Sequence, residues 1–273
     1  MSLRADLQTL HDAFPEQDAT MPALFVGHGN PMNAIEDNPF SRGWEQVGTE
    51  VPNPSAILCI SAHWETRGTY LTAMEQPKTI HDFGGFPREL FEVEYPAPGS
   101  PALAALASET VQPDIEAGLT NDWGLDHGAW SVLCRMFPEA KVPVVQLSLD
   151  RSQPAEFHYE LGKALKPLRK RGVLIVASGN IVHNLRLAKW NDSAADWALA
   201  FDAQSAELIA GGNDSALVNY ANLGEEARLS IPTPEHYQPL LYTLGLREKE
   251  EPLTFFNEGV TLNSISMRSI RLG

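Results

Sequence analysis

The chain has 273 residues, of which 43% are hydrophobic and 20% charged, a composition typical of a folded globular protein rather than a disordered one. Its 35 acidic and 20 basic residues give a formal net charge of −15, which disfavours nucleic acid and anionic membranes as partners, because both are negatively charged. The N-terminus carries no apolar signal segment, and two cysteines, Cys59 and Cys134, exclude a disulfide framework. We therefore expect a cytoplasmic protein.

The first 20 residues are polar and predict an N-terminal arm, either loose or partly helical. Beyond it, four continuous apolar runs predict strands at 23–27, 56–62, 142–149 and 173–177. Strands without polar alternation are typically covered on both faces, as in a parallel or mixed sheet between helices.

Helical spacing of apolar residues follows at 100–111, 154–171 and 194–210, and closing strands are predicted at 252–256 and 264–272. Strands that alternate with helices predict an α/β fold. Residues 74–99 are rich in Gly, Pro and aromatic residues and predict a long irregular segment, which is often functional in a compact domain. No linker, repeat or low-complexity tract interrupts residues 21–273, so we expect one domain with a central mixed, largely parallel sheet.

Three of the eight histidines follow predicted strands. His28 comes directly after the strand at 23–27, His63 directly after the strand at 56–62, and His183 just after the strand at 173–177. The carboxyl ends of parallel strands meet at one edge of a sheet, so these imidazoles are expected to converge there. Imidazole is a common metal ligand, and sites rich in nitrogen donors suit zinc or non-haem iron. The pattern predicts a metal site at the strand ends.

Two further histidines stand in unusual settings. His127 is flanked by glycines in the segment 123–130, and His236 lies in a proline-rich turn before a predicted helix. The remaining polar positions His11 and His158 are predicted to lie at the surface. The loop 81–87, with its glycines and phenylalanines, predicts either a pocket wall or an ordinary surface loop. The chain has no Gly-x-Ser-x-Gly, no phosphate-binding loop and no dinucleotide-binding fingerprint, which disfavours those enzyme classes.

Seven motifs together resemble the class III extradiol ring-cleavage dioxygenases of the LigB type, and more narrowly their 4,5-DOPA extradiol dioxygenase subfamily. They lie at 27–32, 61–64, 81–87, 95–99, 126–128, 177–184 and 232–237, in the order of the family. The resemblance implies that residues 21–273 form the catalytic domain. It also implies a metal site at the C-terminal ends of the strands.

The resemblance further implies a role for each histidine. His28 and His63 match the two metal-binding histidines of the family, and His236 matches the third ligand position, which is a glutamate in many class III enzymes. His183 matches the catalytic histidine, and the resemblance also makes it a fourth metal ligand in a substrate-free site. His127 matches a second active-site histidine. The implied cofactor is one divalent ion per chain, Zn²⁺ or Fe²⁺.

The implied reaction is the opening of a catechol such as DOPA by O2, at a ring bond outside the two hydroxyl carbons, to give a muconic semialdehyde. His183 is the expected acceptor of a phenolic proton. Two alternatives remain open from the residues: a zinc-dependent hydrolase or amidase on the same scaffold, and a non-enzymatic metal-binding protein. The expected partners are the catechol and O2, without nucleic acid or membrane, and the chain is expected to be a monomer or a small homo-oligomer.

Overall fold

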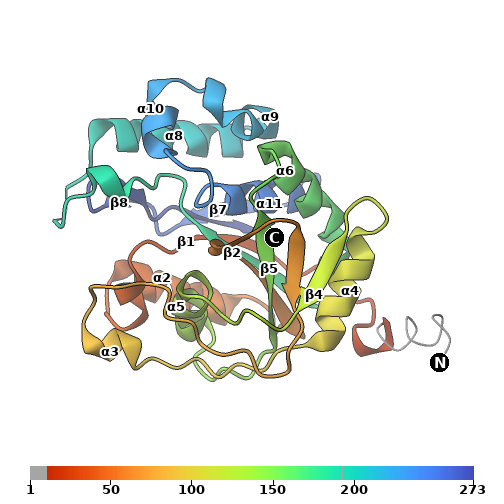
Figure 1. Cartoon of the computed structure of the whole chain (residues 1–273). Coiled ribbons are helices and arrows are strands. Elements are labelled where there is room, and N and C mark those ends of the chain that lie inside the picture. The colour runs from red at the N-terminus through yellow and green to blue at the C-terminus, as the bar shows by residue number, and fades with distance from the viewer. Residues whose placement is uncertain (1–10, 192) are drawn as a thin grey trace.

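The computed structural model describes residues 11–191 and 193–273. The described strands form one sheet of eight, in the order β4-β3-β5-β2-β6-β1-β10-β7, and a small sheet in which β8 pairs with β9. Helices cover both faces of the large sheet (Figure 1). The α/β fold with a central mixed, largely parallel sheet that the sequence predicts is confirmed.

Four neighbouring strands at the centre of the sheet are parallel to one another. They are β5 (Val144–Asp150), β2 (Ala56–Thr66), β6 (Val173–Gly179) and β1 (Ala23–Gly27). Every residue of β1, β5 and β6 is buried, as expected for strands covered on both faces. The prediction that the second strand ends at 62 is wrong, because the chain stays extended to pair Glu65 and Thr66 with β5.

Both edges of the sheet contain strands of the opposite direction. On one side β10 (Ser269–Leu272) is antiparallel to β1, and β7 (Leu253–Phe256) is antiparallel to β10. On the other side β3 (Thr69–Thr72), which was not predicted, is antiparallel to β5 and parallel to β4 (Ala117–Thr120). The closing strand predicted at 264–272 is divided, since its first part forms β9 (Ile265–Ser266), which pairs with β8 (Val260–Thr261).

The three predicted helices are present with changed bounds. They are α4 (Pro101–Val111), α6 (Ala155–Ala164) continued by the short α7 (Lys166–Arg169), and α8 (Asp196–Ala210). The helix predicted at 154–171 is interrupted next to Pro167, which has no amide hydrogen to continue the helical bonding. Within the described ranges, no helix is both long and apolar enough to cross a membrane.

Other helical segments connect these elements. They are η1 (Pro31–Ala34), α2 (Pro39–Glu50), α3 (Arg88–Phe91), α5 (His127–Met136), η2 (Leu185–Leu187), α9 (Asp214–Val218), η3 (Tyr220–Asn222), α10 (Glu225–Ser230) and α11 (Gln238–Leu246). One face of the sheet packs against α4, α6, α8 and α11, and the other packs against α2 and α5 through the buried side chains of Trp44 and Trp130.

The predicted N-terminal arm lies partly outside the described residues, which begin at residue 11. The described part contacts the domain: the Phe14 side chain is buried, and the Arg171 guanidinium donates to the Phe14 carbonyl at 2.7 Å. The backbone N–H of Gln17 donates to the carbonyl of Lys170, also at 2.7 Å. Residues 14–17 are therefore held against the domain.

One of the two histidines predicted to lie at the surface is buried. The His11 side chain is 43% exposed, as expected. His158 is fully buried, because α6 packs closely against α11, and its Nδ1 lies 3.0 Å from the Tyr242 hydroxyl. The prediction is wrong because this position faces a second helix rather than solvent.

Candidate metal centre

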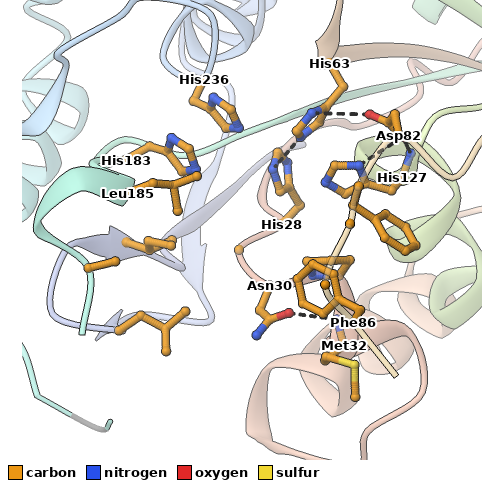
Figure 2. A pocket seen from close by; sticks show the side chains of 18 of the residues that line it. His28, Asn30, Met32, His63, Asp82, Phe86, His127, His183, Leu185 and His236 are labelled. Atoms are coloured by element: carbon orange, nitrogen blue, oxygen red, sulfur yellow. Dashed lines mark hydrogen bonds and ion pairs between the residues drawn. The ribbon is translucent and has the colours of Figure 1, made fainter. Parts of the chain in front are cut away.

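Five histidines face one pocket at the carboxyl end of the central parallel strands (Figure 2). His28 directly follows β1, and His63 lies near the end of β2. His183 follows β6, His127 is the first residue of α5, and His236 stands in the turn before α11. Because β2, β6 and β1 are adjacent and parallel, their ends bring residues from distant parts of the sequence to the same edge.

The histidines form two adjoining groups whose potential ligand atoms lie within 4.8 Å of one another. The first contains His28, His63 and His127, and the second contains His183, Glu235 and His236. The four sequence-predicted ligands are thus divided between the groups, with His28 and His63 in the first and His183 and His236 in the second. His127 and Glu235, which were not predicted to be ligands, complete them.

The rings of His28, His63 and His236 are nearly equally spaced. Their centroids are separated by 5.0 Å (His28–His63), 5.3 Å (His28–His236) and 5.0 Å (His63–His236). Three imidazoles bound tetrahedrally, with metal–nitrogen bonds of about 2.1 Å, would have centroids roughly 5 Å apart. The spacing of these three rings fits one divalent ion.

Ser178 determines which nitrogen of His28 faces the centre. Its hydroxyl donates to the Gly128 carbonyl at 2.6 Å and lies 3.0 Å from His28 Nδ1. Because the hydroxyl proton is engaged with that carbonyl, the oxygen accepts from Nδ1–H, which leaves a lone pair on Nε2. A serine of β6 thereby leaves the Nε2 lone pair of His28 free and connects His28 to α5.

Glu235 has the same effect on His236. Its Oε1 lies 3.0 Å from His236 Nδ1, and a carboxylate accepts the proton of that nitrogen. One face of the His236 ring is covered by the ring of His183, with centroids 3.5 Å apart and ring planes within 7° of parallel. Metal-binding histidines commonly have a carboxylate partner of this kind.

The Asp82 carboxylate contacts two imidazoles, those of His63 and His127. Its Oδ2 lies 3.5 Å from His63 Nδ1, and its Oδ1 accepts the backbone N–H of His127 at 2.9 Å. The same Oδ1 lies 3.0 Å from His127 Nδ1, but the geometry of this contact is not that of a hydrogen bond. Burial alone would raise the pKa of Asp82, but its contacts with His127 outweigh that effect and lower it. The residue is therefore a carboxylate at neutral pH.

Two of these imidazoles bring their Nε2 atoms close together. His28 Nε2 and His63 Nε2 lie 3.2 Å apart. Burial is the main cause that lowers the pKa of both rings, to about 3 for His63 and well below the usual value for His28. Protonation of either ring is therefore disfavoured. If both neutral rings carry their proton on Nδ1, the lone pairs of the two Nε2 atoms point at each other and repel. A divalent metal relieves that repulsion, so the residues present fit the expected ion.

The other two rings are also neutral at pH 7. Burial lowers the pKa of His183 to about 4, with Glu235 opposing the shift, and burial also lowers the pKa of His236 well below its usual value. Neutral imidazoles are the form that binds metals or accepts protons.

The beginning of α5 is supported by the buried carboxyl group of Asp126. This group accepts the Ser61 hydroxyl at 2.6 Å, the backbone N–H of Ala129 at 3.1 Å and the side-chain amide of Gln146. Ser61 Oγ in turn accepts the backbone N–H of His63 at 3.2 Å. His63 and the helix that begins with His127 are thus joined through one buried group.

The pocket has a volume of about 810 Å³ and two apolar walls. Met32, Phe83, Phe86 and Pro87 line one side, which includes the loop 81–87 that the sequence left open between pocket wall and surface loop. The opposite side contains residues of the segment 185–190 together with Leu262 and Ile265. Among the described residues that line it, the only acidic side chain is Asp82, and none is Lys or Arg. Such a site accommodates a flat apolar ring with its polar edge at the histidines.

Sequence reasoning missed three residues of this site: Asp82, Ser178 and Glu235. Each of them contacts an imidazole, and in two cases that imidazole is distant in the sequence. Only Glu235, which directly precedes His236, carries a local signal. Ser178 lies 150 residues from His28 in the sequence, and Asp82 lies 45 residues from His127. No rule based on sequence spacing finds such partners.

Comparisons with known proteins agree with one another. Residues 22–270 match the family model described as the catalytic LigB subunit of aromatic ring-opening dioxygenase. The chain is 51% identical over 259 residues to a 4,5-DOPA dioxygenase extradiol of Escherichia coli (strain K12), covering 93% of this chain and 95% of the relative. It is 38% identical over 237 residues to the protein of the same name from Beta vulgaris, covering 84% and 88%. A crystal structure of an uncharacterized Escherichia coli K12 protein matches with a TM-score of 0.80 and 46% identity, over 93% of this chain and all of that one.

Proposed function

Because the chain belongs to the LigB family of aromatic ring-opening dioxygenases, and is an extradiol ring-cleavage enzyme, we propose that its substrate is DOPA or a closely related catechol. The names of the curated relatives support this choice. The observation that carries it is the cluster of five histidines at the base of an apolar pocket large enough for a substituted aromatic ring. The hydrolase and the non-enzymatic alternatives have no comparable support.

His28, His63 and His236 are the proposed ligands of one divalent ion. Their Nε2 atoms are the donors in this proposal, because Nδ1 of each ring lies beside an oxygen of Ser178, Asp82 or Glu235. An iron(II) ion held there would acidify the catechol hydroxyls and carry electrons from the ring to O2. Zinc suits the same donors but has no redox chemistry, so we propose iron as the ion that supports turnover.

His183 is the proposed acceptor of a phenolic proton. Its ring lines the pocket and is neutral at pH 7, because burial lowers its pKa to about 4. A neutral imidazole beside the bound hydroxyls accepts the proton at a ring nitrogen and later returns it to the opened product. In the same proposal His127 presents Nε2 to the substrate, since its Nδ1 faces Asp82.

The apolar walls are proposed to hold the ring and to exclude water. Phe83 and Phe86 lie on one side and Leu185 and Ile265 on the other. A catechol ring between them would keep its two hydroxyls at the histidines and its side chain at the pocket mouth. We also propose a cytoplasmic location, which the two free cysteines, Cys59 and Cys134, support. A monomer or small homo-oligomer without nucleic-acid or membrane partners stays a prediction.

The test is oxygen consumption by protein loaded with iron(II) under anaerobic conditions. On addition of DOPA, we expect stoichiometric O2 uptake and a yellow ring-opened product. A matched phenol without the second hydroxyl should give neither, and protein loaded with zinc should be inactive. Absence of uptake with DOPA and with a panel of other catechols would contradict the proposal.

A further inference from the structure

The Asp82 carboxylate contacts two imidazoles and one backbone amide of the candidate site. Its Oδ1 accepts the backbone N–H of His127 at 2.9 Å and lies 3.0 Å from His127 Nδ1, while its Oδ2 lies 3.5 Å from His63 Nδ1 (Figure 2). The side chain is 19% exposed. Both carboxylate oxygens thus lie beside the two histidines, and no Lys or Arg is among the described residues that line the pocket.

We propose that Asp82 is a positioning residue that keeps the proton of His63 on Nδ1, so that the lone pair of Nε2 remains available to the metal. The inference rests on the proposed function, in which His63 is a ligand. A carboxylate only accepts hydrogen bonds, so a neutral His63 beside it places its proton on the nearer nitrogen. The negative charge of Oδ2, 3.5 Å from Nδ1, attracts an N–H group at that position, which favours this tautomer over the alternative.

The alternative tautomer of His63 has a partner within reach. His63 Nε2 lies 3.2 Å from His28 Nε2, and Ser178 leaves His28 Nε2 with a lone pair. A proton on His63 Nε2 would therefore be donated to His28 Nε2, and the two nitrogens that should bind the ion would bind each other. By holding the proton of His63 on Nδ1, Asp82 disfavours this hydrogen bond between His63 and His28.

The position of Asp82 is also informative. It belongs to the loop 81–87, whose Phe83 and Phe86 line the pocket, whereas His63 lies on β2. The loop that lines the pocket is therefore the element that sets the position of the proton on a strand residue. We infer that correct seating of this loop is a condition for metal binding as well as for substrate binding.

The decisive variant is Asp82→Asn, which keeps the shape of the side chain. The backbone N–H of His127 donates to Oδ1, so the amide oxygen is expected to stay there and the NH2 group to face His63 Nδ1. His63 Nδ1 must then accept, and its proton moves to Nε2. Long-range ¹H–¹⁵N spectra of the imidazoles distinguish the two tautomers in the metal-free full chain, with His63 assigned from its loss in His63→Asn.

We expect an Nδ1–H tautomer of His63 in the unaltered protein and an Nε2–H tautomer in Asp82→Asn. Zinc affinity, measured by competition with a chelator, should fall about tenfold to a hundredfold, the range found when outer partners of metal-binding histidines are removed. Asp82→Glu, which restores a carboxylate, should recover the Nδ1–H signal and part of the affinity. Glu89→Gln, at an exposed position of α3, is the matched control and should change neither.

An Nε2–H tautomer in the unaltered metal-free protein overturns the inference, and so does an unchanged zinc affinity in Asp82→Asn. If Asp82→Asn does not fold, as judged by circular dichroism, the tautomer of the unaltered protein and the zinc affinity of Asp82→Glu still decide. These readouts use neither iron nor catechol. A failure of ring cleavage would therefore leave them intact, and their failure would leave ring cleavage intact.

Discussion

His183 and His236 stack face to face, with centroids 3.5 Å apart and ring planes within 7° of parallel. The lone pairs of an imidazole lie in the plane of its ring, so an ion in line with His236 lies off the plane of His183. In this arrangement His183 is a poor ligand for an ion that His236 binds, which agrees with its proposed role as a proton acceptor. The expected role as a fourth ligand in a substrate-free site would require His183 to turn out of the stack.

The stack separates the effects of removing the two rings. His236→Ala should lose most of its metal affinity, whereas His183→Ala should bind the ion nearly as well as the unaltered protein. Its kcat should fall about 10²- to 10⁴-fold, the usual contribution of a general base. Chelator competition and oxygen-uptake kinetics measure the two effects. A greater loss of metal from His183→Ala than from His236→Ala would contradict this assignment.

Ser178→Ala tests the hydrogen bond that orients His28. Without the hydroxyl, His28 Nδ1 loses its acceptor, and metal affinity should fall about tenfold to a hundredfold. Ser205→Ala is a suitable comparison, because it removes another buried hydroxyl, one without a hydrogen-bond partner among the described residues. Equal zinc affinities for the two variants would show that Ser178 does not act on the metal centre.

Gly128 is expected to tolerate no side chain. A Cβ at this position would lie 2.4 Å from Ser61 Oγ and 2.8 Å from His63 Cδ2, both closer than real contacts allow. Gly128→Ala should therefore displace His63 and lower metal affinity, while a change on the same helix, Ser131→Ala, should not. The two variants are compared by zinc competition, and an unchanged affinity in Gly128→Ala would refute the steric argument.

His158 should make the protein less stable in acid. Burial lowers its folded-state pKa to about 4, from the usual value of 6.5. Between pH 6.5 and 4 the unfolded chain binds a proton that the folded protein does not, so the free energy of unfolding falls as the pH falls. The full effect of this group is roughly 3 kcal/mol.

The check on His158 is urea unfolding at several pH values with metal-free protein. The unaltered protein should lose stability more steeply between pH 6.5 and 4 than His158→Gln, which cannot take up this proton. Parallel curves for the two proteins would mean that His158 contributes nothing to the acid sensitivity.

The sequence was sufficient for the strands that carry the site and insufficient for the groups that tune it. β1 and β6 are continuous apolar runs, so their ends, and with them His28 and His183, could be located from the pattern alone. β3 and β4 have four residues each and no such run. Asp82 reaches His63 and His127 only through the packing of the loop 81–87 beside β2, which no local pattern encodes. His158 was misplaced because helical periodicity cannot reveal that two faces of α6 are covered.

The histidines of this centre are contributed by segments that begin at β1 and end before α11, so His28 and His236 stand near opposite ends of the chain. During synthesis on the ribosome, the first of these residues emerges long before the last. A nascent chain therefore cannot capture the ion with the complete set of ligands until nearly the whole polypeptide has emerged. With the proposed ligands, metal loading would follow the synthesis of almost the whole chain.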